Sequence, residues 1–193
     1  MAQKWLTKQT VVDAAVRLIE AQGEEAFSMR LLADTLGVKT ASLYNHTKSM
    51  DALLDEVCRT ALRLLSGAEF QAIEHKSRAQ AVRALAEVYR RFGKEHAALY
   101  WLAMNRAARG GAIQDEAAYC LTEPLVRMME GYALPDEEKI HFRRFFRSIV
   151  HGFLSQEREG FFSHYPADPD ESFRFAVERY INNLEQAEKG REY

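Results

Sequence analysis

The sequence contains little of what builds sheets, disulfide scaffolds or membrane spans. It has only 4 prolines in 193 residues, and alternating runs of valine, isoleucine and threonine are scarce, which favours helices over strands. Cys58 and Cys120 lie in helical patterns, and their spacing is not that of a disulfide framework. We therefore expect free thiols in a reducing compartment. Neither a long apolar run nor an apolar core in residues 1–7 is present. We therefore expect a cytoplasmic protein with no membrane partner.

Catalytic, metal-binding and cofactor-binding motifs are also lacking. The histidines form neither an H-x-x-x-H pattern nor a pair of E-x-x-H motifs, and there is no nucleophile elbow, P-loop or dinucleotide fingerprint. We therefore predict no catalytic residue, no metal ligand and no cofactor. An enzyme with a helical active site need leave no linear motif, so enzymatic turnover of a small molecule is kept as a third hypothesis.

The charge balance does not point to a polycation. The chain has 26 basic and 28 acidic residues, a net charge of -2 and 47% hydrophobic residues, which are ordinary values for a globular protein. Residues 1–55 hold six basic and seven acidic side chains. Any contact with nucleic-acid phosphates must therefore come from local groups rather than from bulk charge.

The most informative stretch is residues 28–46, which has the pattern of two short helices around a tight turn. Leu32 and Leu36 lie on one apolar face with Leu31, and Ala33 is small enough for close packing. Gly37 can end the first helix in a left-handed conformation. A second helix then begins at Lys39 or Thr40, with Leu43 and part of Tyr44 directed inward.

The other face of this second helix carries short polar side chains. Thr40, Ser42, Asn45 and His46 offer hydrogen-bond donors and acceptors to solvent. A helix that buries little and displays such groups is what a helix-turn-helix protein places in the DNA major groove. An ordinary helical hairpin with a solvated polar face would show the same local pattern.

Helical patterns continue on both sides of this stretch. Thr7 is expected to cap a first helix that ends near Gly23, with Trp5 packing before the cap and Lys4 and Lys8 able to reach phosphate. Phe27 is expected to be buried, and Ser28 to cap the next helix. A fourth helix is predicted from Met50 to about residues 66–67, long enough to bridge to the rest of the chain.

The remaining residues predict further helices without a flexible linker. We expect a helix capped by Ser77, another after Gly93, a break at residues 109–111, and a helix kinked or restarted at Pro124. Asp136 is expected to cap a long helix reaching about Gly160. Asp168 followed by Pro169 predicts the start of the last helix.

These patterns resemble the DNA-binding domain of the TetR (tetracycline repressor) family. The resemblance is carried by V-V-D-A-A-V-R-L-I-E-A-Q-G, by S-M-R-L-L-A-D-T-L-G-V-K-T-A-S-L-Y-N-H and by A-L-L-D-E-V, over roughly residues 7–57. It implies an all-α fold of about nine helices. A three-helix helix-turn-helix domain (residues 1–50) would be joined by a long helix to a C-terminal ligand-binding and dimerisation domain (residues 51–193).

The resemblance also implies which residues face DNA. Arg30 could pair with a guanine edge, and Tyr44 and His46 are phosphate-facing in proteins of this kind. The DNA-binding residues expected by this match are Ser28, Arg30, Lys39, Thr40, Ser42, Tyr44, Asn45 and His46.

Two positions depart from the family pattern. Thr47 replaces an aromatic residue, and Met50 replaces a lysine that would contact phosphate. Lys48 lies close by and is our hypothesis for the replacement, so we add it to the DNA-binding set.

The C-terminal part carries a second, looser resemblance. His151-Gly152 and the segment H-A-A-L-Y-W-L resemble a subgroup of the family named for a Trp-His-Gly signature, although the tryptophan is absent and Arg147 stands near its place. Bulky inward residues in this part could line a largely apolar pocket for an effector, or could simply fill the core. These candidate ligand residues are Phe92, Tyr100, Trp101, Met104, Tyr119, Met128, Phe146 and His151.

The last two helices are apolar around more of their circumference than one core requires, which predicts a homodimer through them. A fully buried pair in a monomer is the alternative. The sequence thus predicts a ligand-responsive, dimeric transcriptional regulator, a repressor released from a palindromic double-stranded DNA operator by a small molecule. The second hypothesis is a dimeric interaction protein whose helix-turn-helix no longer reads DNA, which Thr47, Met50 and the acidic balance motivate.

Overall fold

The regular secondary structure of the described residues consists of helices. A computed structural model describes residues 6–164 and 166–190, and within them it has nine α-helices, one short 3-10 helix and no strand. The predicted all-α class is confirmed. The packing expected of Trp5 and the phosphate-reaching role expected of Lys4 fall outside these ranges.

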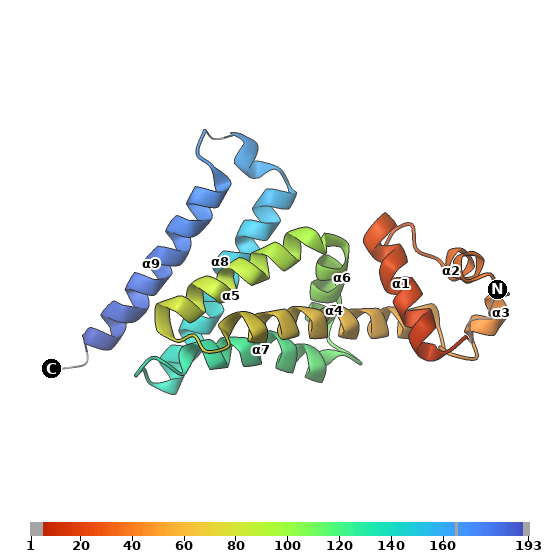
Figure 1. Cartoon of the computed structure of the whole chain (residues 1–193), viewed down its shortest axis with the longest axis horizontal. Coiled ribbons are helices and arrows are strands. Elements are labelled where there is room, and N and C mark those ends of the chain that lie inside the picture. Colours follow the sequence, from red (N-terminus) through yellow and green to blue (C-terminus); the bar gives the residue numbers. More distant parts are fainter. Residues whose placement is uncertain (1–5, 165, 191–193) are drawn as a thin grey trace. The chain divides into compact units, whose positions relative to one another are not determined.

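The chain divides into two compact units. The first comprises residues 1–64 and 96–119, and the second comprises residues 65–95 and 120–193. Helices α4 (Met50–Ile73) and α7 (Gln114–Met129) each contribute residues to both units. Figure 1 shows each helix in sequence colours.

In the first unit, α1 (Lys8–Gln22) packs on α2 (Met29–Leu36), α2 packs on α3 (Thr40–Leu43), and α6 (Ala97–Arg109) also packs on α1. The local signals explain these boundaries. The Thr7 side chain accepts a hydrogen bond from the Thr10 N–H, and the Ser28 hydroxyl accepts one from the Leu31 N–H at 3.1 Å. Both predicted caps are therefore confirmed. The predicted burial of Phe27 is confirmed as well.

In the second unit, α5 (Arg78–Glu95) packs on both α8 (Asp136–Arg158) and α9 (Pro169–Lys189). Figure 1 shows α8 and α9 joined through a turn that contains the 3-10 helix η1 (Phe161–His164). Arg90 of α5 ties the three helices together, because its guanidinium donates to Glu157 of α8 and to Asp170 of α9 at 2.7 Å. The Asp168 cap and the first-turn Pro169 occur as predicted.

Several helix ends differ from the sequence prediction. α4 continues past residues 66–67 to Ile73, because an exposed glycine within a helix costs only about 1 kcal/mol and does not stop it. α5 likewise runs through Gly93 to Glu95. Pro135, rather than Asp136, is the residue before α8, which ends at Arg158. Pro124 lies inside α7 without ending it.

Substitution by alanine should affect stability differently at two helical glycines of the second unit. A Cβ added at Gly93 would lie 2.5 Å from Cδ1 and 3.2 Å from Cγ of the buried Leu154, whereas one at Gly67 meets no atom within 4 Å. Gly67→Ala should raise the free energy of unfolding by about 0.5–1 kcal/mol. Gly93→Ala should be less stable than Gly67→Ala by about 1–3 kcal/mol, because Leu154 must move. Urea denaturation of both variants tests this, and equal stabilities would contradict the tight packing of α5 on α8.

Candidate nucleic-acid interface

The turn between α2 and α3 places α3 with one defined side inward. Gly37 takes a left-handed conformation (φ 67°, ψ 32°), as predicted, and its N–H donates to the carbonyl oxygens of Ala33 and Asp34. Leu43 is fully buried, at 0% exposure, and so are Leu32 and Ala33 of α2. Because Leu43 fixes the inward side of α3, the other residues of this helix are exposed or half-buried.

The predicted DNA-facing residues follow this division. Arg30, Lys39, Tyr44, Asn45 and Lys48 are exposed. The Arg30 side chain is 89% exposed and lies 4.0 Å from Asp34, a distance at which an exposed ion pair contributes little. Tyr44 is 52% exposed, so it points outward more than the sequence pattern suggested.

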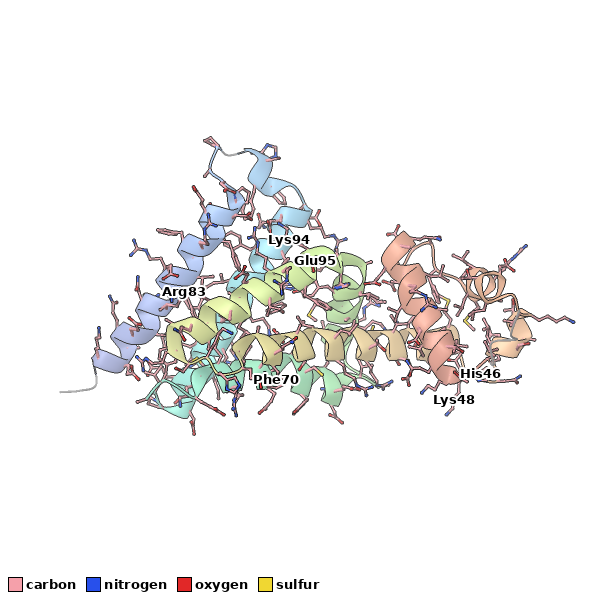
Figure 2. The ribbon with its side chains drawn as sticks, in the orientation of Figure 1. His46, Lys48, Phe70, Arg83, Lys94 and Glu95 are labelled. Atoms are coloured by element: carbon pink, nitrogen blue, oxygen red, sulfur yellow. The ribbon has the colours of Figure 1, made fainter. Side chains whose placement is uncertain are left out.

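The other predicted residues are half-buried. Thr40, Ser42 and His46 lie at the edge of the exposed face, and Ser28 is engaged as the cap of α2. Figure 2 shows His46 and Lys48 close together in the segment between α3 and α4. The structure therefore gathers the nine predicted residues on α2, on α3 and on the segment after it.

Sequence reasoning missed the cap of α4, which fixes the segment that follows α3. The Ser49 hydroxyl accepts a hydrogen bond from the Ala52 N–H at 3.0 Å, and the Thr47 hydroxyl donates to the Ser49 carbonyl at 3.0 Å. A serine three residues before the donating N–H is an ordinary N-cap signal that could have been found. Thr47, which departs from the family pattern, therefore has a structural role next to the α4 cap.

Two carboxylates near the start of α4 are bound by a single arginine of α6. Nη2 of Arg106 lies 2.6 Å from Oδ1 of Asp51 and 2.8 Å from Oδ1 of Asp55, and the arginine side chain is only 14% exposed. Burial alone would lower the pKa of Arg106, but the hydrogen bonds to both aspartates raise it. This Arg106 clamp fixes the beginning of α4 to α6 within the first unit.

A surface hollow of about 430 Å³ lies beside the exposed face of α3. Lys8, whose reach toward phosphate was predicted, is on its wall but is paired with Glu56 at 2.8 Å. Arg59 is likewise held, by Glu56 and Glu116. Of the cations lining this hollow, Lys48 is the one without an ion pair among the described residues. The hollow is lined by Lys8, Tyr44, Asn45, His46, Thr47, Lys48, Ala52, Asp55, Glu56, Arg59 and Ala112.

The candidate ligand residues are divided between the two units. Tyr100, Trp101, Met104 and Tyr119 belong to the first unit. The rings of Tyr100 and Trp101 pack edge to face with centroids 5.2 Å apart. Tyr119 is 61% exposed, so it does not lie at an inward position as the sequence predicted.

The remaining four candidates belong to the second unit. Phe92, Met128 and Phe146 are buried there, and Phe146 packs on the ring of Tyr180 with centroids 5.4 Å apart. His151 is half-buried, and its pKa is lowered by burial and by the charge of Arg147. The buried aromatic positions thus contribute to the core, whether or not they also meet a ligand.

A larger groove lies on the second unit between α5 and α9. It encloses about 600 Å³ over a floor of Ala86, Phe173 and Val177, and its rim is charged. Figure 2 shows Arg83 and Lys94 at different levels along α5. Much of the rim is internally neutralised, because Arg83 pairs with Glu178 and Lys94 with Glu157. None of these residues was predicted from the sequence except as a part of a helix.

Family comparisons agree with this geometry. A family model described as "Bacterial regulatory proteins, tetR family" matches residues 11–57, which include the helix-turn-helix. A second, described as "Tetracyclin repressor-like, C-terminal domain", matches residues 82–180, just over half of the chain. These two matches define the class of protein as a DNA-binding transcriptional regulator. The chain belongs to the TetR family.

Individual relatives and structures are similar at low identity. The HTH-type transcriptional regulator YobS of Bacillus subtilis is 26% identical over 181 residues, covering 93% of both chains. The class D tetracycline repressor of Escherichia coli is 28% identical over 138 residues, 68% of this chain and 58% of the repressor. Apo ActR from Streptomyces coelicolor has the same fold, with a TM-score of 0.70 at 22% identity over 98% of this chain and 99% of that one.

The family is one of regulators rather than enzymes. Within residues 6–164 and 166–190, no helix combines the length and apolar character needed to span a bilayer, and no cluster of three or more potential metal ligands occurs. The Trp-His-Gly subgroup stays a prediction, since the C-terminal match carries only the general description.

The Arg106 clamp predicts a loss of stability when the guanidinium is removed. Arg106→Gln leaves the largely buried Asp55 without its charged partner, so the free energy of unfolding should fall by about 1–3 kcal/mol. Arg109→Gln, on the exposed side of the same helix, is the matched control and should change it by less than about 0.5 kcal/mol. Thermal and urea unfolding measure both variants. Equal effects of the two substitutions would show that the clamp does not hold α4.

Proposed function

We propose that this regulator is a dimeric repressor that binds a palindromic operator and is released from it by a small-molecule effector. The observation that carries the proposal is the two-sided character of α3. Leu43 is buried at 0% exposure, while Lys39 just before the helix and Tyr44 and Asn45 just after it are exposed. A polar helix held rigidly on a packed scaffold is suited to major-groove reading.

Apolar side chains left exposed on α8 and α9 support the proposed dimer. Phe145 of α8 is 45% exposed and Phe175 of α9 is 61% exposed, and Ile140 of α8 is also exposed. Large apolar residues gathered on one helix pair mark a partner surface more often than they mark a solvated one. A twofold axis through this surface would repeat α3 symmetrically. Palindromic recognition then requires the two copies to reach half-sites about 34–36 Å apart, or a multiple of it.

Release by an effector would follow from a two-state equilibrium. An effector that binds a conformation with misplaced α3 helices withdraws the dimer from DNA only if it binds that conformation much more tightly. A structurally similar protein, ActR, has been crystallised in complex with (S)-DNPA. This supports control of the present chain by a small molecule.

The direct test is binding of the full chain to DNA. Fluorescence anisotropy with the DNA upstream of its own gene, followed by selection from random duplexes, should yield a sequence with twofold symmetry and a stoichiometry of one dimer per site. Absence of any sequence preference over random duplex would refute the operator-binding function. It would favour the second hypothesis, a dimeric interaction protein, for which Met50 at the start of α4 is the motivating residue.

Arg30 is expected to contribute sequence specificity. Its exposed guanidinium can bind a guanine edge through two hydrogen bonds, so Arg30→Ala should weaken operator binding by about 1–3 kcal/mol and relax selection at one base pair. Arg127→Ala, an exposed arginine of α7, is the matched control. Competition against operators substituted one base pair at a time measures the effect. A uniform loss across all of these operators would place Arg30 on phosphate instead.

Lys48 is expected to contact phosphate. Lys48→Ala should weaken binding to specific and random duplexes alike, and it should reduce the slope of log K against log salt by about 0.9. The exposed Lys76 provides the control substitution to alanine. Titrations at several salt concentrations measure the slope, and an unchanged slope would remove Lys48 from the interface.

A further inference from the structure

A buried carboxyl group in the second unit has no role in the DNA-binding face. Glu69 lies on the last part of α4 and is only 3% exposed, one turn after the equally buried Ser66. It shares a helix face with Leu65 and Ile73, which are buried and apolar. No hydrogen bond joins its carboxyl to another described residue, and the charged group whose field reaches it is Arg147. Burial raises the pKa of Glu69 to about 8, so at neutral pH it is mostly a protonated acid.

The facing cation, Arg147, also has one buried polar atom without a partner among the described residues. This atom is Nε, and Arg147 lies on α8. His151, one turn later on α8, is half-buried, and burial and the Arg147 charge both lower its pKa. Such a histidine stays neutral at pH 7. The local positive charge of Arg147 is therefore not compensated by these two neighbours.

Other arginines of the same unit show how a structural ion pair looks in this protein. Arg90 donates to Glu157 at 2.9 Å and to Asp170 at 2.7 Å. Arg78 donates to Glu188 at 2.6 Å. Arg83 of α5 is likewise paired with Glu178 of α9. The charge of Arg147 acts on Glu69, but no hydrogen bond joins the two side chains. Their polar groups therefore remain able to bind a third group, such as a ligand.

We propose that Arg147 and Glu69 form the polar subsite of the effector site, and that the effector is an apolar organic molecule carrying an oxyanion such as a carboxylate. This inference rests on the proposed effector-controlled function. Two donors would meet the anion, the Nε–H of Arg147 and the O–H of protonated Glu69. The apolar body would lie among neighbours such as Phe146 and Val150, which flank Arg147 on α8 and are fully buried.

The charge state of Glu69 gives the proposal a defined pH dependence. Ionisation of Glu69 removes its donor and adds a negative charge beside the bound anion, so affinity for an anion should fall as pH rises above about 8. Glu69→Gln keeps a donor but cannot ionise. It should bind the anion at neutral pH and lose the dependence on pH.

Two fluorescent probes with the same aromatic body test the subsite. 1-Anilinonaphthalene-8-sulfonate is an anion, and N-phenyl-1-naphthylamine is its neutral counterpart without the sulfonate. With the full chain at pH 7, Arg147→Gln should weaken binding of the anionic probe about tenfold or more. It should leave the neutral probe within about twofold. Arg144→Gln, an exposed neighbour on α8, is the matched control and should change neither.

Unfolding and DNA measurements separate the alternatives. Arg147→Gln removes an unpaired charge, so it should melt at the same temperature as the wild type or higher. Failure of the wild type to bind the anionic probe, or equal loss of both probes in Arg147→Gln, overturns the anion subsite. Equal pH dependence in Glu69→Gln and the wild type overturns the role of Glu69. If the anion subsite fails while operator binding persists, the proposed regulator stands. If operator binding fails, the probe results still define a ligand site.

Discussion

Burial of one leucine governs what the N-terminal unit can present to DNA. α3 has only four helical residues, too few to persist without tertiary packing. Leu43, fully buried where α3 packs on α2, supplies that packing and fixes which side of the helix faces inward. The side chains on the other sides of α3 are then exposed because of the helix orientation, not because of their own polarity. The polar residues of α3 can form a recognition surface only because Leu43 fixes that orientation.

The segment after α3 is fixed by different interactions. Ser49 caps α4, Thr47 bonds to the Ser49 carbonyl, and Arg106 holds Asp51 and Asp55 in the first two turns. The Ser49 and Thr47 bonds are local, whereas the Arg106 clamp joins residues about 50 positions apart in the chain. Together these interactions keep the segment between α3 and α4 from moving independently of α6. The proposed dimer would require that rigidity, because its two copies of α3 must match a fixed half-site spacing.

The parts that sequence reasoning found were those determined by nearby residues. The Thr7 and Ser28 caps, the left-handed Gly37 and the Asp168–Pro169 start depend on neighbours within four positions, so the pattern contained the answer. The length of α4 did not follow in this way, because packing of residues 68–73 overrides the weak signal of Gly67. Tyr119 was misplaced for a related reason, since the inward side of α7 depends on how that helix is packed.

Charged partners separated by many residues could not be deduced from spacing. The pairing of Lys8 with Glu56, which engages a cation expected at phosphate, joins residues 48 positions apart. Glu69 did leave a signal, because it follows Leu62 and Leu65 and precedes Ile73 on an otherwise apolar face. A carboxyl on such a face is either paired or functional. The sequence could not tell which, since that depends on whether Arg147 of α8 bonds to it.

α4 connects the two sites as a single covalent element. Asp55, bound by the Arg106 clamp, and Glu69 both belong to this helix and are 14 residues apart in the sequence. A helix interior transmits rotation and translation because its hydrogen bonds resist local bending. An anion held at Glu69 and Arg147 would therefore change the position of α3 only by moving α4 as a body or by breaking the clamp at its start. The proposed effector control would then depend on the Arg106 pairs with Asp51 and Asp55 as well as on the proposed ligand site.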